Sequence, residues 1–275
     1  MSELKKRRLG RTELMVTELG LGAMDTPQAT EGAETIHLAL EMGINFIDTA
    51  RIYEGSESLL GEVIRARGGK SFYVASKTIN RTVDGSQYDV DRSLRLLGVD
   101  RIDLYQLDDV LPKDWDAVLD EEHGALTGLK TAQFRGLIGH IGISSHSMDV
   151  LEKAISCGQF DTVMLEYSAF FQDAESLIPL ANEQDVGVIV MRPLGGSGRM
   201  SSVRSGSGVT EPLHSLTPAA LLRYVLSNSG VSVAIPGVRF PSRIRDNVEL
   251  ASTYVPMDTS QKSDCETEAR RLFQD

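Results

Sequence analysis

Short apolar runs, each followed by a longer segment with helical periodicity, recur along this chain. Runs such as Gly187-Val188-Ile189-Val190 contain several β-branched residues and no polar position. Continuous apolar runs of this kind are typical of parallel strands that are buried on both faces. Eight strands are predicted, over Glu18–Ala23, Ile44–Ala50, Ser71–Lys77, Arg101–Leu107, Leu137–Ser144, Thr162–Tyr167, Gly187–Pro193 and Val231–Gly237.

Helical spacing of apolar residues is found between these strands. The predicted helices include Ala33–Met42, Ser56–Arg65, Tyr88–Leu97, Met148–Ser156, Glu175–Glu183 and Pro218–Leu226. Strand and helix alternating eight times predict a (β/α)8 barrel, a TIM barrel forming a single domain over residues 1–275. A doubly wound open sheet has the same alternation. However, residues 20–25 (GLGAMD) do not complete the G-x-G-x-x-G phosphate loop of that fold.

Two segments stand outside the repeat. Residues 6–17 predict an N-terminal β-hairpin, turned at residues 10–13, that closes the floor of the barrel. Residues 195–215 are rich in Gly and Ser and have no periodicity. We interpret them as a loop after the seventh strand, either an active-site lid or a surface excursion without a role.

Composition and charge narrow the class of protein. The chain is 41% hydrophobic and 24% charged, with a net charge of -11, as in soluble proteins without a nucleic-acid partner. No run approaches the ~20 apolar residues that cross a bilayer, and no apolar stretch follows the basic N-terminal residues. We therefore expect a cytoplasmic protein with a small-molecule substrate and no membrane contact. Cys157 and Cys265 are too far apart for a metal motif, and no pattern indicates the oligomeric state.

Four polar residues fall at the ends of predicted strands, where barrels place functional side chains. Asp48 and Tyr53 follow the second strand, Lys77 ends the third, and Asp108 follows the fourth. Tyr53 could donate a proton to a carbonyl oxygen, but a free phenol, with a pKa near ~10, is a weak acid. An adjacent Lys77 ammonium favours the phenolate and makes Tyr53 a better acid. Asp48 would keep Lys77 charged and oriented.

The segments around these residues resemble motifs of the aldo-keto reductase family. They are FIDTARIYEGSE at 46–57, VASKT at 74–78 and DLYQLDDV at 103–110. The resemblance extends from about residue 6 to residue 252. It implies a barrel that transfers hydride to or from a nicotinamide cofactor, with Asp48, Tyr53, Lys77 and the position of Asp108 as catalytic residues.

Asp108 departs from the family, which usually has His at this position. A carboxylate there would repel a developing oxyanion and oppose ionisation of Tyr53, or pair with Lys77 in competition with Asp48. A protonated Asp108 could instead donate a hydrogen bond, and an ionised one could act as the base in alcohol oxidation. Family members with Glu here reduce activated C=C bonds. A further alternative is that the position has drifted, with loss of carbonyl reduction, and these alternatives stay open.

The cofactor motifs imply a second group of residues. IGISSH at 141–146 resembles the segment that binds the nicotinamide carboxamide, here through Ser144 and Ser145. MRPLGG at 191–196 resembles the segment beside the nicotinamide and pyrophosphate. The cofactor contacts that the resemblance implies are Met191, Pro193, Leu194 and Gly196 in this segment, and Met164 in the sixth predicted strand. Met164 and Met191 stand where many members have Gln and Tyr.

Members of one bacterial branch of the family have the same two departures, and this chain resembles that branch. FDTVM at 160–164 shares that likeness. Many members of that branch have a cysteine-rich iron–sulfur segment. Because Cys265 is solitary in the C-terminal part of the sequence, we expect none here.

The motif IPGVRFPSRIRDN at 235–247 resembles the segment that surrounds the adenosine end of the cofactor. Arg239 and Arg243 would meet a 2′-phosphate, while Asp246 and Asn247 would contact the adenine. Two arginines favour NADP(H) over NAD, although Gly237 replaces a Lys found in some members. Without a cofactor, the same arginines would be solvated charges at the start of a helix.

The expected function is NADP-dependent hydride transfer with a small carbonyl, alcohol or activated C=C substrate. Loops 111–136 and 197–216 are expected to determine specificity. One alternative is a nucleotide-binding partner or sensor protein with vestigial catalysis, because the usual His is absent. A second is a redox-neutral epimerase or lyase that recycles a bound cofactor and uses the extra carboxylate as base.

Overall fold

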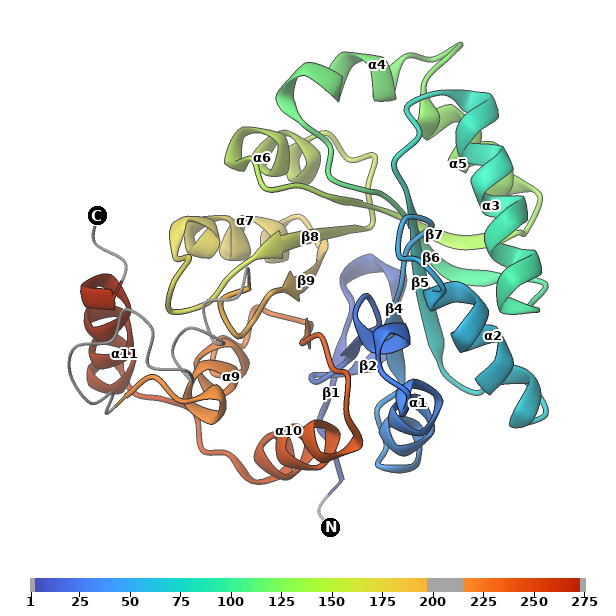
Figure 1. Ribbon diagram of the computed structural model, residues 1–275. Helices are drawn as coiled ribbons and strands as arrows, with labels where there is room; N and C mark the ends of the chain where they lie inside the picture. Colours follow the sequence, from blue (N-terminus) through green and yellow to red (C-terminus); the bar gives the residue numbers. More distant parts are fainter. Residues whose placement is uncertain (1–2, 197–214, 273–275) are drawn as a thin grey trace.

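Eight parallel strands surrounded by helices form the body of the molecule, as the computed structural model shows for residues 3–196 and 215–272 (Figure 1). The strands follow one another in chain order around the sheet. They are β3 (Leu21–Gly22), β4 (Phe46–Asp48), β5 (Tyr73–Thr78), β6 (Ile102–Leu107), β7 (Ile138–Ser144), β8 (Thr162–Glu166), β9 (Gly187–Met191) and β10 (Val233–Ile235). All eight predicted strands are confirmed, and only β5 extends beyond its predicted range, by one residue.

The sheet closes on itself between its first and last strands. The amide of Gly20 donates to the carbonyl of Ala234 over 2.8 Å, and the amide of Ala234 donates to the carbonyl of Glu18 over 2.9 Å. The amide of Gly22 donates to the carbonyl of Pro236 over 3.0 Å. These bonds join the edges that an open sheet would leave free, so the barrel is confirmed and the doubly wound alternative is excluded.

Side chains alternate between the interior of the barrel and the layer under the helices. Phe46, Ala75 and Leu104 belong to a compact inner cluster, whereas Ile47 and Tyr105 pack in the larger cluster between strands and helices. Because residues two apart on a strand point to the same face, the side chains that follow the inner ones also point inward. This rule directs Asp48, Lys77 and Gln106, each the last or next-to-last residue of its strand, into the C-terminal mouth of the barrel.

Helices cover the outside of the barrel (Figure 1). They are α1 (Gly32–Glu41), α2 (Ser56–Ala66), α3 (Val83–Leu97), α4 (Trp115–Leu119), α5 (Ala125–Phe134), α6 (Met148–Ser156), α7 (Leu177–Glu183), α9 (Pro218–Leu226), α10 (Pro241–Thr253) and α11 (Thr259–Leu272). Within the described residues, none of them is long and apolar enough to cross a membrane. The predicted bounds of α6 and α9 are confirmed.

Two helix predictions are corrected by the structure. Helix α3 begins at Val83 rather than Tyr88, because the Thr82 side chain accepts a bond from the amide of Gly85 and caps the helix earlier. The expected loop 111–136 contains α4 and α5, of which α5 lies between β6 and β7. Gly128 weakens the helical pattern of α5, yet a Cβ there would lie 2.1 Å from the Ser86 hydroxyl oxygen on α3. The close packing of the two helices therefore requires this glycine. Residues 197–214, most of the other two expected loops (195–215 and 197–216), lie outside the described residues.

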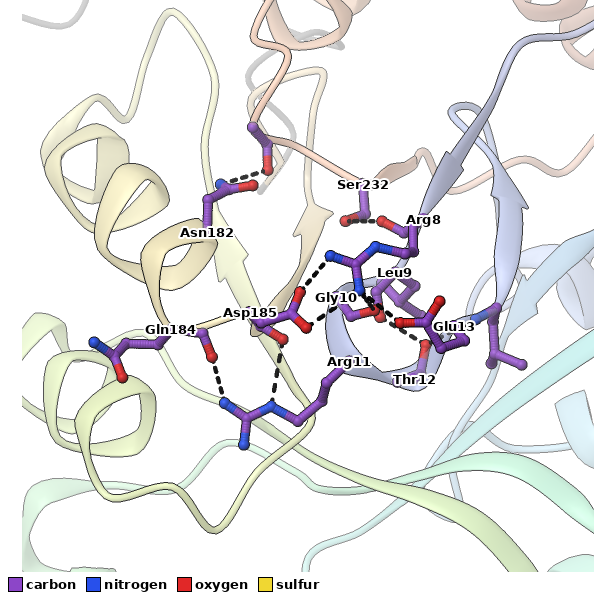
Figure 2. A network of polar contacts seen from close by, with 12 residues as sticks. Arg8, Leu9, Gly10, Arg11, Thr12, Glu13, Asn182, Gln184, Asp185 and Ser232 are labelled. Atoms are coloured by element: carbon purple, nitrogen blue, oxygen red, sulfur yellow. Dashed lines mark hydrogen bonds and ion pairs between the residues drawn. The ribbon is translucent and has the colours of Figure 1, made fainter.

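The N-terminal hairpin is confirmed. Strands β1 (Lys6–Arg8) and β2 (Met15–Thr17) pair antiparallel around a 3-10 turn, η1 (Gly10–Thr12). Figure 2 shows its contacts with the segments that lead into β9 and β10. Arg8 lies 2.6 Å from the carboxylate of Asp185, and its carbonyl accepts a bond from Ser232 over 3.1 Å. These partners precede their strands, so the hairpin closes the N-terminal end of the barrel.

Substitution of Gly10 tests this closure. Gly10 has a φ of +52°, and a Cβ there would lie 2.2 Å from the amide nitrogen of Gly187. We expect Gly10→Ala to lower the free energy of unfolding by about 2–4 kcal/mol, measured by urea denaturation. Gly68→Ala is the matched control, because Gly68 has a φ of +77° but no atom near its Cβ position. Equal losses of unfolding free energy in both variants would show that close packing of the hairpin contributes nothing to stability.

Candidate active site

A buried lysine stands at the centre of the barrel mouth. Lys77, near the end of β5, donates from Nζ to Asp48 Oδ1 over 2.5 Å and to the Thr49 carbonyl over 2.8 Å. The same Nζ lies 3.5 Å from the hydroxyl oxygen of Tyr53. Gln106, on β6, donates to the other oxygen of Asp48 over 3.3 Å. The structure thus brings together three of the four predicted catalytic residues, and adds Gln106.

Tyr53 is held in a tight turn after β4. The amide of Arg51 donates to the Lys77 carbonyl over 3.1 Å, which ties the turn to β5. The Arg51 guanidinium pairs with the buried carboxylate of Glu57, which also accepts a bond from Ser76 over 2.6 Å. The ammonium of Lys77 lies 4.7 Å from the centroid of the Tyr53 ring. The phenol therefore faces the ammonium because both ends of its turn are anchored.

Burial dominates the electrostatics of this cluster. It raises the pKa of Asp48 to about 6, although the Lys77 charge opposes the rise. Burial alone would lower the pKa of Lys77, but the charges of Asp48, Tyr53 and Asp108 together raise that pKa above its ordinary value. Burial also raises the pKa of Tyr53; Lys77 lowers it, and Asp48 and Asp108 raise it again. The Lys77 charge thus makes Tyr53 a better acid, as expected, although burial and the two carboxylates leave the pKa of Tyr53 above its ordinary value.

Asp108 follows β6 and is nearly buried. Its Oδ1 accepts a bond from the hydroxyl of Ser144 over 2.9 Å, and that hydroxyl accepts one from the amide of Asp109, also over 2.9 Å. The hydroxyl of Ser144 therefore bridges the amide of Asp109 and the carboxyl group of Asp108. Among the described residues, Asp108 takes Ser144 as its partner rather than competing with Asp48 for Lys77. Arg81 donates to the carbonyls of Asp108 and Asp109 and holds this turn.

The predicted nicotinamide contacts lie on β7, β8 and β9. Ser144 ends β7 beside Asp108, as described above. The Ser145 hydroxyl is fully buried; it donates to the Val110 carbonyl over 2.7 Å and accepts from the amide of Ser147 over 3.0 Å. Met164 belongs to the inner cluster of the barrel, and Met191 packs against that cluster. The two methionines therefore lie at the interior of the barrel, beneath its C-terminal mouth.

The remaining predicted cofactor residues follow β9 and β10. After β9, Pro193 is buried, Leu194 is half-buried against the core, and Gly196 adopts a φ of +54°. After β10, Gly237 is exposed and is bridged to Gly22.

The predicted adenosine contacts lie around the start of α10. Arg239 lies 3.5 Å from the carboxylate of Asp25, and Arg243 lies 3.3 Å from that of Asp246. Asn247 is half-buried on the same helix. The two arginines are each half-exposed.

Sequence reasoning missed a charged cluster on the β7–β9 side of the mouth. The carboxylate of Glu166, at the end of β8, lies 3.2 Å from His146 Nδ1 and 3.3 Å from Arg192 Nη1. Its other oxygen is buried without a hydrogen-bond partner among the described residues. Strand alternation could have found Glu166, because it lies two residues beyond the inward-facing Met164. The same rule relates Gln106 to Leu104.

A tyrosine, a buried lysine and an aspartate thus meet at the mouth of a closed parallel barrel. The chain belongs to the aldo/keto reductase family, whose model matches residues 18–214. It is similar to the uncharacterized oxidoreductase YqkF of Bacillus subtilis, with 27% identity over 90% of this chain and 92% of that one.

Two further similarities cover nearly the whole chain. The L-galactose dehydrogenase of Arabidopsis thaliana is 26% identical over 98% of this chain and 95% of its own length. The holo form of an aldo-keto reductase from Bacillus halodurans has a TM-score of 0.77 and 25% identity. That alignment covers 98% of this chain and 96% of the Bacillus halodurans chain. Both alignments also include parts of the chain outside residues 18–214.

Proposed function

We propose that this protein is an NADP-dependent oxidoreductase acting on a small alcohol or carbonyl, with activated C=C bonds as a further candidate. The observation that supports this most directly is the position of Lys77 Nζ, bonded to Asp48 and 3.5 Å from the Tyr53 hydroxyl. When bound, the nicotinamide supplies or accepts the hydride. The residues of the chain bind the reactants, exclude water and move the proton.

The donor set after β10 fits NADP(H), the cofactor of this family. Arg239 and Arg243 each pair with a carboxylate, of Asp25 and Asp246, that is itself partly or largely exposed. Such exposed pairs are weak, so both guanidinium groups are available to a 2′-phosphate. We assign Asp246 and Asn247 to the adenine, and Ser144, Met164 and Met191 to the nicotinamide end. Ser145 would stabilise the loop that carries Ser144, since its hydroxyl is already bonded within the protein.

Tyr53 is the proton donor in reduction and the acceptor in oxidation. The Lys77 charge stabilises the phenolate that forms when the proton leaves, and Asp48 keeps the ammonium in place. Proton transfer by a positioned side chain typically accelerates a reaction by about 10²–10⁴-fold. Because Lys77 and Asp48 are buried, little water competes for these contacts.

Asp108 favours the oxidative direction. Burial raises the pKa of Tyr53, and the charges of Asp48 and Asp108 add to that rise against the opposing charge of Lys77, so Tyr53 is a weak proton donor for carbonyl reduction. The Asp108 carboxylate accepts the Ser144 hydroxyl and can likewise accept the hydroxyl of an alcohol substrate. We therefore propose that Asp108 assists removal of the alcohol proton. Similarity to a protein named L-galactose dehydrogenase makes an aldose one candidate substrate.

A substrate panel with variants of Asp108 tests this function. NADP⁺ reduction and NADPH oxidation would be measured over alcohols, sugars, aldehydes, ketones and enones. We expect native turnover to favour alcohols, and Asp108→Asn to lower alcohol oxidation by about 10²-fold. Asp108→His should gain carbonyl reduction. Rapid carbonyl reduction by the native protein, unchanged in Asp108→Asn, would contradict the role of Asp108.

The same panel distinguishes the two rival functions that the missing His suggests. A sensor protein would bind NADPH without transferring hydride to any member of the panel. A redox-neutral epimerase or lyase would form product with no net change in absorbance of the reduced nicotinamide. Net hydride transfer with one substrate class would exclude both.

A further inference from the structure

We infer that Gln106 is a positioning residue for the catalytic pair of Asp48 and Lys77. Its side-chain amide donates to the second oxygen of Asp48, and this bond keeps the carboxylate ionised and turned toward Lys77. The hydroxyl of Thr162, on β8, in turn fixes the orientation of that amide. The inference rests on the proposed function and deepens it, because it gives Gln106 and Thr162 a part in the same reaction.

The two oxygens of the Asp48 carboxylate have different partners. Oδ1 lies 2.5 Å from Lys77 Nζ, whereas Oδ2 accepts a bond from Gln106 Nε2 over 3.3 Å. A buried carboxylate oxygen that lacks a donor favours the protonated form of the acid. Because Asp48 is buried, the bond from Gln106 stabilises negative charge on the side of the carboxylate that faces away from Lys77.

The Gln106 side chain lies in the interior of the barrel, next to a glycine. Gln106, Gly142 and Thr162 are neighbours in register on β6, β7 and β8. Thr162 lies two residues before Met164 of the inner cluster, so its side chain also faces inward. A Cβ at Gly142 would lie 2.9 Å from Gln106 Cγ and 2.3 Å from Thr162 Oγ1. The missing side chain at this position therefore lets the two polar side chains meet.

Two buried oxygens at this meeting point have no hydrogen-bond partner among the described residues. They are Gln106 Oε1 and Thr162 Oγ1, and both side chains are fully buried. The Cβ position of Gly142 that is close to Thr162 is also 3.3 Å from Gln106 Oε1. A hydroxyl donates and an amide oxygen accepts, so the two satisfy each other, directly or through one buried water molecule. This bond selects the orientation of the amide in which Nε2, rather than Oε1, faces Asp48.

The charge of Asp48 is sensitive to a single hydrogen bond. Burial raises the pKa of Asp48 to about 6 against the charge of Lys77; the charge of Asp108 adds to the rise, and the bond from Gln106 reduces it. Tyr53 also faces this carboxylate, and the pKa values of both Tyr53 and Lys77 are raised, so these two groups keep their protons near neutral pH. Loss of the Gln106 bond should therefore raise the pKa of Asp48 by about one unit.

The test follows protonation of Asp48 by infrared spectroscopy in the native protein, in Gln106→Met and in Thr162→Val. The carboxyl band that is absent from Asp48→Asn reports the protonated acid and needs no turnover. We expect a native midpoint at a pH of about 6, a midpoint about one unit higher in Gln106→Met, and a smaller rise in Thr162→Val. Gln133→Met is the matched control and should leave the midpoint unchanged, because the Gln133 side chain, on α5, donates to the Gly139 carbonyl over 2.9 Å.

Kinetics then show whether the charge of Asp48 matters for the reaction. The pH dependence of kcat/KM would be compared between Gln106→Met and the native protein, with the substrate class that the panel identifies. Gln106→Met should lose about tenfold in kcat/KM below a pH of about 6 and little at about pH 9, where both proteins carry the ionised carboxylate. A merely structural role of Gln106 would lower kcat/KM equally at both pH values.

An unchanged infrared midpoint in Gln106→Met would overturn the inference, and so would a loss of kcat/KM that is the same at both pH values. An unchanged midpoint in Thr162→Val would overturn the role of Thr162. A raised midpoint in a protein that transfers no hydride would support Gln106 as the group that positions Asp48, and would contradict the proposed function instead.

Discussion

Tyr53→Phe is expected to lower kcat by about 10²–10⁴-fold in both reaction directions. The substitution removes only the hydroxyl that lies 3.5 Å from Lys77 Nζ, and the ring can keep its place over the ammonium. The predicted cofactor contacts lie on other strands and on α10, so NADPH affinity should stay unchanged. Steady-state kinetics and fluorescence titration with NADPH measure the two quantities separately.

Tyr88→Phe provides the control for Tyr53→Phe, since Tyr88 is a 63% exposed residue of α3. It should leave both kcat and NADPH affinity as they are. Unchanged turnover of the true substrate in Tyr53→Phe would show that another group transfers the proton. A loss of NADPH affinity in the same variant would instead place Tyr53 in the cofactor site.

Lys77→Met should lower the free energy of unfolding by about 3–5 kcal/mol at pH 7, because it leaves the buried carboxylate of Asp48 without its cation. Burial already raises the pKa of Asp48 to about 6 with Lys77 present. Without Lys77 that pKa rises further, and a protonated Asp48 carries no charge to bury. The loss measured by urea denaturation should therefore shrink as the pH is lowered from the higher pKa of Asp48 in the variant to about 6, and should stay constant below that pH.

Two further variants test the cause of this loss. Asp48→Asn/Lys77→Met removes both charges and should recover part of the stability. Lys70→Met breaks the pair of Lys70 with Asp103, whose side chains are about one-fifth exposed, and should cost about 1 kcal/mol or less. If Lys77→Met cost no more than Lys70→Met, the pair of Lys77 with Asp48 would not be the buried interaction that the structure describes.

The order of strands could be predicted because each buried parallel strand needs a continuous apolar run. Helix boundaries were harder to predict, because individual hydrogen bonds at the helix ends determine them. The cap at Thr82 moved the start of α3, and the glycine that lets α5 pack closely against α3 also hid α5 from its apolar pattern.

The site was predictable as far as it depends on position along strands. Asp48, Lys77 and Asp108 lie at strand ends, and the barrel brings strand ends to one mouth. Gln106 and Glu166 obey the same alternation, but Gln106 was only part of the motif at 103–110 and Glu166 belongs to no quoted motif, so neither was assigned a role. The partners of Asp108 and Glu166 could not be predicted, because each comes from a different strand or loop.

The sequence alone therefore determined the barrel, the hairpin at its floor and the strand ends that carry the chemistry, since these follow from local hydrophobic pattern and chain order. Only the tertiary structure decided that the pKa of Tyr53 rises rather than falls, that Asp108 takes Ser144 as its partner, and that Glu166 contacts both His146 and Arg192. Each of these depends on burial and on distances between segments far apart in the chain, which the pattern of one segment does not contain.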